Sequence, residues 1–77
     1  MTVKIIAISK DNNAGYVDIG YGFIWFVSPL IKGYIRSTAE TEKEMQKALR
    51  SGAFTKCDME FKFLKGAIEW MKDNSKR

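Results

Sequence analysis

Residues 23–27 of the 77-residue chain read Phe-Ile-Trp-Phe-Val, a continuous run of aromatic and β-branched side chains. Such side chains favour extended backbone because their bulk packs well on a pleated surface. The run is the strongest strand signal in the chain. It ends at Ser28-Pro29, because proline has no N–H to donate to a neighbouring strand.

Further strands are predicted on the N-terminal side of this run. Residues 3–9, Val-Lys-Ile-Ile-Ala-Ile-Ser, predict a strand inside the sheet, and residues 16–19 predict another. The segment 10–15 between them is rich in Asp, Asn and Gly, which accept turn conformations, so the two strands form a hairpin. Gly20 and Gly22 predict either a tight reversal or a bulge within one long bent strand.

The segment 30–36 admits two interpretations. Ser28-Pro29 has the form of an N-cap and a first helical position, which would open a helix. Gly33 in the middle of the segment, together with the strand-forming Tyr34 and Ile35, favours a strand. We expect a strand here, with the helix as the alternative.

Two helices are predicted in the C-terminal half. Residues 37–40, Ser-Thr-Ala-Glu, have the form of a capping box, and a helix follows to Arg50 with Gly52 as its C-terminal stop. A second helix is expected at roughly 59–73, capped by Thr55 or Asp58. Its apolar side chains spread over about 200° of the helix, which favours packing on the sheet and also on the first helix or a second copy.

These elements predict an α+β fold, because strands precede helices along the chain. We expect a three- or four-stranded antiparallel sheet from the N-terminal half, with two C-terminal helices packed on one face. At this length, residues 1–77 make a single compact domain, with a frayed polar tail at 74–77.

Composition excludes several classes of protein. No apolar run reaches the length of a membrane span, no secretory signal is visible, and the single cysteine cannot form an internal disulfide. Histidine is absent, which removes most zinc sites and the common nucleophile–histidine pairs. We therefore expect a non-enzymatic, cytoplasmic protein with no cofactor, no metal and no membrane partner.

Cys57 is the one candidate nucleophile. It follows Lys56 and lies near a predicted helix N-terminus, and both features would lower the pKa of a thiol. Without a histidine base we expect a small, half-buried structural residue instead.

The aromatic run predicts a binding surface. Strand alternation sets Tyr21, Phe23 and Trp25 on one side, so helices that cover one face would leave large rings on the other. Exposed apolar patches usually mark protein interfaces, and Trp, Tyr and Arg are their usual anchors. We expect a protein partner of unknown identity, with a homodimer left open, anchored by Tyr21, Trp25, Tyr34 and Arg36.

Nucleic acid is the alternative partner. The chain has 13 Lys and Arg against 9 Asp and Glu, a net charge of +4. Lys43, Lys47 and Arg50 cluster on the side of the first helix opposite its apolar residues, where they could contact phosphates. Tyr21 and Trp25 would then stack on bases.

Overall fold

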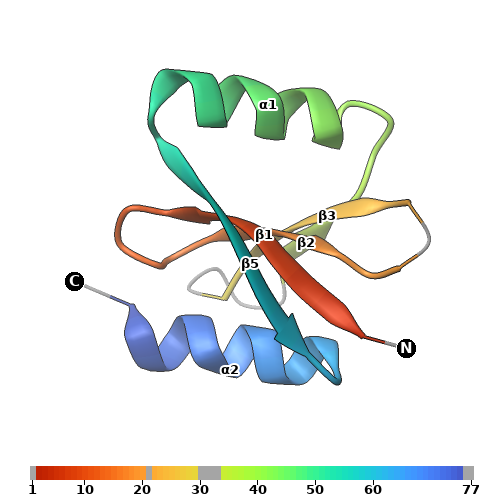
Figure 1. Cartoon of the computed structure of the whole chain (residues 1–77), viewed down its shortest axis with the longest axis vertical. Helices are drawn as coiled ribbons and strands as arrows, with labels where there is room; N and C mark the ends of the chain where they lie inside the picture. The colour runs from red at the N-terminus through yellow and green to blue at the C-terminus, as the bar shows by residue number, and fades with distance from the viewer. Residues whose placement is uncertain (1, 21, 30–33, 76–77) are drawn as a thin grey trace.

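The computed structural model describes residues 2–20, 22–29 and 34–75. Along the chain they form β1 (Val3–Ser9), β2 (Gly15–Asp18), β3 (Ile24–Ser28), β4 (Tyr34–Arg36), α1 (Thr41–Ser51), β5 (Phe54–Phe61) and α2 (Leu64–Asn74). The strands make one antiparallel sheet in the order β4-β3-β2-β1-β5. The chain therefore crosses from one sheet edge to the other through α1. The two helices lie on opposite faces of the sheet (Figure 1).

The α+β class is confirmed, but two details of the predicted architecture are wrong. The sheet has five strands rather than three or four, and the helices are neither both C-terminal to the sheet nor packed on one face. Both differences have one cause. A strand, β5, lies between the helices and takes the far edge of the sheet beside β1.

Residues 54–61 form this strand instead of the cap and first turn of the second helix. Their period is two, because half-buried apolar side chains alternate with exposed charged ones: Cys57, Met59 and Phe61 against Lys56, Asp58 and Glu60. Residues 54–56 and 59–61 pair with β1, which supplies hydrogen-bond partners for backbone groups on the inner edge of the strand. The proposed caps at Thr55 and Asp58 are therefore wrong.

The predicted N-terminal strands are confirmed. β1 spans 3–9 inside the sheet, and its turn into β2 contains Asn12 in the left-handed region at φ 60°. Gly20 and Gly22 have φ of 93° and 76°, which marks a reversal between β2 and β3 rather than one bent strand. In the ambiguous segment 30–36, residues 34–36 form strand β4, and 30–33 lie outside the described residues.

The first helix follows the prediction at its end but not at its start. Gly52 has φ 84° and donates its N–H to the Leu49 carbonyl, so it is the C-terminal stop. The capping box at 37–40 does not form, since Glu40 is the N-cap and makes no side-chain cap bond. The Ser37 hydroxyl instead donates to the Ile24 carbonyl at 3.1 Å and joins this segment to β3.

The larger core lies between the sheet and α2. Ile5, Val17, Ala67 and Met71 are fully buried there, and nine half-buried apolar side chains surround the cluster. The approach is close at Gly15 in β2, where an added Cβ would lie 3.3 Å from the Met71 sulfur. An added Cβ would require a small shift of this sulfur, so glycine suits the close approach of Met71 to β2.

A smaller core lies between the sheet and α1. Ala7, Tyr16 and Met45 are its buried members. The rings of Tyr16 and Phe26 are 5.3 Å apart, and those of Tyr16 and Phe54 are 5.1 Å apart. These tilted pairs fill the space under α1.

The sheet bends beneath α1. Ile5 and Ile8 of β1 pair with Val17 and Gly15 of β2 on one side and with Met59 and Thr55 of β5 on the other. Over this same length of sheet, β1 therefore has one residue more than β2, and β5 has one residue more than β1. The extra residue of β1 turns both Ile6 and Ala7 toward the α1 core. The strands thus lengthen toward the β5 edge.

The end of α2 is joined to the turn between β1 and β2. The Asn12 side chain donates to the Asn74 carbonyl at 3.0 Å, and the Ser75 hydroxyl donates to the side-chain carbonyl of Asn13. Asn74 and Ser75, the first two residues of the expected frayed tail 74–77, are therefore hydrogen-bonded to this turn, and 76–77 lie outside the described residues.

Candidate functional site

The aromatic sheet surface expected for a protein partner is largely covered. Trp25 points to the α2 side, where it packs half-buried against the larger core. Its neighbour Phe26 packs under α1 on the other side. The aromatic side chains of β3 alternate between the two faces of the sheet, and each face is covered by a helix. These rings therefore pack in the two cores and do not form one exposed surface.

Arg36 is held inside the fold. Its guanidinium donates two hydrogen bonds, of 2.7 and 2.6 Å, to the Glu44 carboxylate on α1 and lies 5.3 Å from the centre of the Phe26 ring. These hydrogen bonds lower the pKa of Glu44, while burial and the charge of Glu44 raise the pKa of Tyr16 beside them. Arg36 thus fastens α1 to β4.

The other two expected anchors are not placed with Trp25 and Arg36. Tyr21 lies outside the described residues. For Tyr34 the structure gives the backbone, which is opposite Ser28 in the pairing of β4 with β3. Of the four residues proposed for a protein partner, the structure therefore describes the side chains of two, and these lie on different faces of the sheet.

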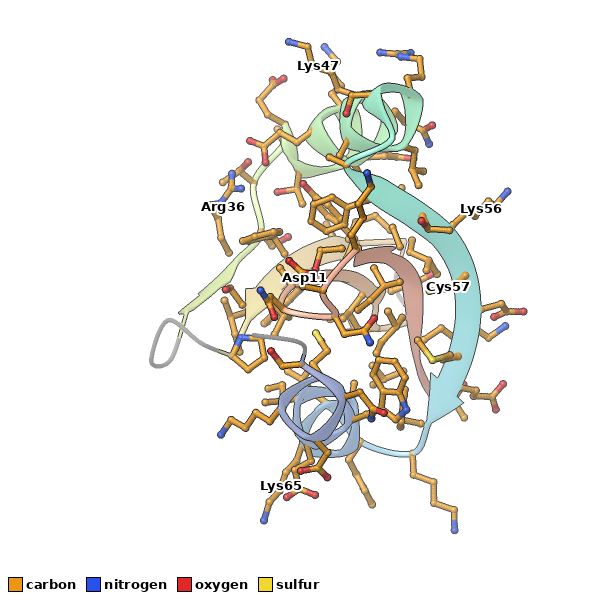
Figure 2. All side chains as sticks on the ribbon, turned by 90° about the vertical axis from the view of Figure 1, so that its left-hand side faces the viewer. Asp11, Arg36, Lys47, Lys56, Cys57 and Lys65 are labelled. Atoms are coloured by element: carbon orange, nitrogen blue, oxygen red, sulfur yellow. The ribbon has the colours of Figure 1, made fainter. Side chains whose placement is uncertain are left out.

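The three basic residues proposed for nucleic acid do come together. Lys43, Lys47 and Arg50 are all exposed on the side of α1 that faces away from the sheet, and Figure 2 shows Lys47 at the extreme end of the molecule. We call these three residues the basic row. An open depression runs along them, and its lining also includes Gln46 and the acidic Glu40, Glu42 and Glu44.

Most of the basic row lacks a counter-ion. The Lys43 ammonium is 3.9 Å from the Glu40 carboxylate, in a weak pair whose side chains are 83% and 66% exposed. Glu44 also lines the depression, but its carboxylate is bonded to Arg36. Within the part of the chain that the structure describes, neither Lys47 nor Arg50 forms an ion pair, so the C-terminal half of α1 presents uncompensated positive charge.

Cys57 is placed for packing and not for nucleophilic attack. Its thiol donates to the Ile5 carbonyl at 3.2 Å. Burial and the negative charge of Asp58 raise the pKa of Cys57, which disfavours the thiolate. Across residues 2–20, 22–29 and 34–75, no three His, Cys, Asp or Glu side chains are grouped as metal ligands.

Two exposed phenylalanines at one end of the sheet lie outside the predicted sites. Phe23 is 62% exposed just before β3, and Phe63 is 72% exposed just after β5. These two loops lie at the same end of the sheet, away from the C-terminus (Figure 1). No local signal marks Phe63, because Leu64 beside it lies between the same lysines and packs against the larger core.

Comparison with known proteins adds no assignment. No family model, curated protein or solved structure matches the chain. None of the described helices is long and apolar enough to cross a membrane.

Proposed function

We propose that the protein is a small, non-enzymatic module that binds the phosphate backbone of nucleic acid with the outward face of α1. One observation carries this proposal: Lys43, Lys47 and Arg50 project from one exposed face, and the last two form no ion pair within the described chain. The raised pKa of Cys57 supports the non-enzymatic part of the proposal.

The spacing of the basic row suits a phosphate backbone. At 1.5 Å per residue, positions 43, 47 and 50 extend over about 10 Å of helix axis. One strand of a duplex carries a phosphate about every 3.4 Å of the duplex axis, and the spacing along the strand itself is longer, so the row can meet two or three phosphates. Contacts to phosphates position a protein without reading sequence, and we expect little sequence preference.

The location of Trp25 supports backbone contact alone. This ring packs on the α2 side of the sheet, whereas the basic row lies beyond the α1 side. Stacking of Trp25 on bases, as first expected, is therefore not a part of the proposal.

Fluorescence anisotropy with a labelled oligonucleotide, as single strand and as duplex, tests the proposal. The double variant Lys47→Gln/Arg50→Gln removes two contacts and should weaken binding by roughly tenfold or more at low salt. The matched control is Lys65→Gln/Lys72→Gln, which removes the same charge from exposed positions of α2 and should change affinity little. Equal losses in both double variants would reduce the effect to net charge and contradict a site on α1.

A protein-binding module is the second candidate, favoured by the exposure of Phe23 and Phe63 at one end of the sheet. Bait protein in its own lysate should then retain a stoichiometric partner through nuclease and high salt. Phe23→Ser/Phe63→Ser should release that partner while Lys47→Gln/Arg50→Gln retains it. Recovery of nucleic acid that high salt removes would favour the first candidate instead.

A further inference from the structure

β5 is the longest strand of the sheet, and no described strand pairs with its outer edge. β5 has 8 residues, whereas β4 at the opposite edge has 3. Its inner edge pairs with β1, and no described strand lies on its outer side. Figure 2 shows β5 on the flank of the molecule, with α1 above and α2 below, so neither helix covers this edge.

Charged side chains on an edge strand usually discourage pairing with another chain. On β5 they have a pattern that distinguishes one partner from others. Lys56 is opposite Ala7 of the α1 core and thus points to the α1 side, as do Asp58 and Glu60 two and four residues later. Asp58 is 77% exposed and its pair with Lys4 is long, at 3.9 Å, so its carboxylate is available for a second pair.

Antiparallel pairing of β5 with the same strand of a second copy can match these charges. Directly opposite residues point to the same face of a sheet. With Cys57 on the two-fold axis, Lys56 of each copy is opposite Asp58 of the other, which makes two attractive pairs and no like-charge pair. With Asp58 on the axis, Lys56 meets Glu60 twice, but the two Asp58 carboxylates meet each other.

We propose that β5 pairs antiparallel with β5 of a second copy, with Cys57 at the two-fold axis, to form a homodimer with one continuous sheet. In this dimer Lys56 and Asp58 make two reciprocal salt bridges across the junction. Both α1 helices lie on the same face of the joined sheet, so both basic rows face the same side. The dimer goes beyond the proposed function and does not depend on it.

Sedimentation equilibrium without nucleic acid tests the dimer up to about 1 mM protein, since a single strand junction is a small interface. The wild-type protein should dimerise. Lys56→Asp and Asp58→Lys each convert both attractive pairs to like-charge pairs and should weaken self-association by about tenfold. Mixing these two variants should form a heterodimer, because the two acidic side chains at positions 56 and 58 of one variant then meet the two lysines at those positions of the other.

Glu60→Lys is the matched control for Asp58→Lys, since both variants change the net charge equally on the same strand. In the proposed register Glu60 is opposite Phe54, so this variant should dimerise like the wild type. Heterodimer formation also shows that each single variant is folded. The proposal is overturned by a wild type that stays monomeric, by a mixture that fails to associate, or by a Glu60→Lys variant that disrupts the dimer as much as Asp58→Lys.

Discussion

α1 and α2 have 11 residues each and pack on opposite faces of the same sheet, yet they differ in how deeply they are buried. α2 buries Ala67 and Met71 completely in the larger core. α1 buries only Thr41 and Met45 over a smaller core and turns its basic row to solvent. Their difference predicts that α2 contributes more to the stability of the domain than α1, whose outward face is the one that binds in the proposed function.

The largest difference in stability is expected when one methionine under each helix is replaced by alanine. Met71 is fully buried and Met45 is 6% exposed. We expect Met71→Ala to lower the free energy of unfolding by about 3 to 5 kcal/mol and Met45→Ala by about 2 kcal/mol, because a cavity in the larger core loses more contacts. Urea unfolding followed by tryptophan fluorescence measures both. Equal losses would show that the two layers contribute alike.

Gly15→Ala tests how tightly α2 is seated. The new Cβ would lie 3.2 Å from the Ala7 carbonyl oxygen and 3.3 Å from the Met71 sulfur. We expect a loss of about 1 to 3 kcal/mol from overpacking. The same substitution in a Met71→Ala background should cost less, since the sulfur is gone. Additive losses in a double-mutant cycle would argue that the glycine serves another purpose.

The pair Arg36–Glu44 tests the attachment of α1. Hydrogen bonds from Arg36 lower the pKa of Glu44, so the pair stabilises the fold above the usual pKa of a glutamate. That stabilisation is lost as the pH falls through the lowered pKa. Glu44→Gln should reduce stability at neutral pH by less than Met45→Ala does, and it should flatten the acid side of the stability profile. An unchanged acid profile would contradict the assignment.

The smallest expected effect concerns the thiol at the sheet edge. Burial and, as the smaller cause, the charge of Asp58 raise the pKa of Cys57. Alkylation by iodoacetamide near neutral pH should therefore be slower than that of a free cysteine. Asp58→Asn should speed it modestly. Rapid alkylation of the wild type would revive a nucleophilic role for Cys57.

Local signals predicted much of the fold. Three isoleucines and a valine predicted strand β1. Gly52 predicted the end of α1, because glycine readily adopts the left-handed conformation that it has there. β5 was missed because its residues continue the apolar pattern of α2, and one short run fits either period. The excessive width of the apolar arc was the sign that two elements had been merged. No local signal states which sheet edge a strand will join.

The candidate site was predicted unevenly for the same reason. Lys43, Lys47 and Arg50 share a face because helix geometry alone places them there. The burial of Trp25 and the pairing of Arg36 with Glu44 depend on which helix covers which face, and that arrangement follows from β5.

The slope of binding affinity against salt concentration tests the division between the two helices most directly. For the wild type, the logarithm of the binding constant for duplex DNA should fall with the logarithm of salt at a slope of about −2 to −3, as expected for two or three phosphate contacts. Lys47→Gln should reduce that slope by about one, and Lys65→Gln on α2 should leave it unchanged. Equal reductions in the two variants, or no dependence on salt, would contradict a binding face on α1.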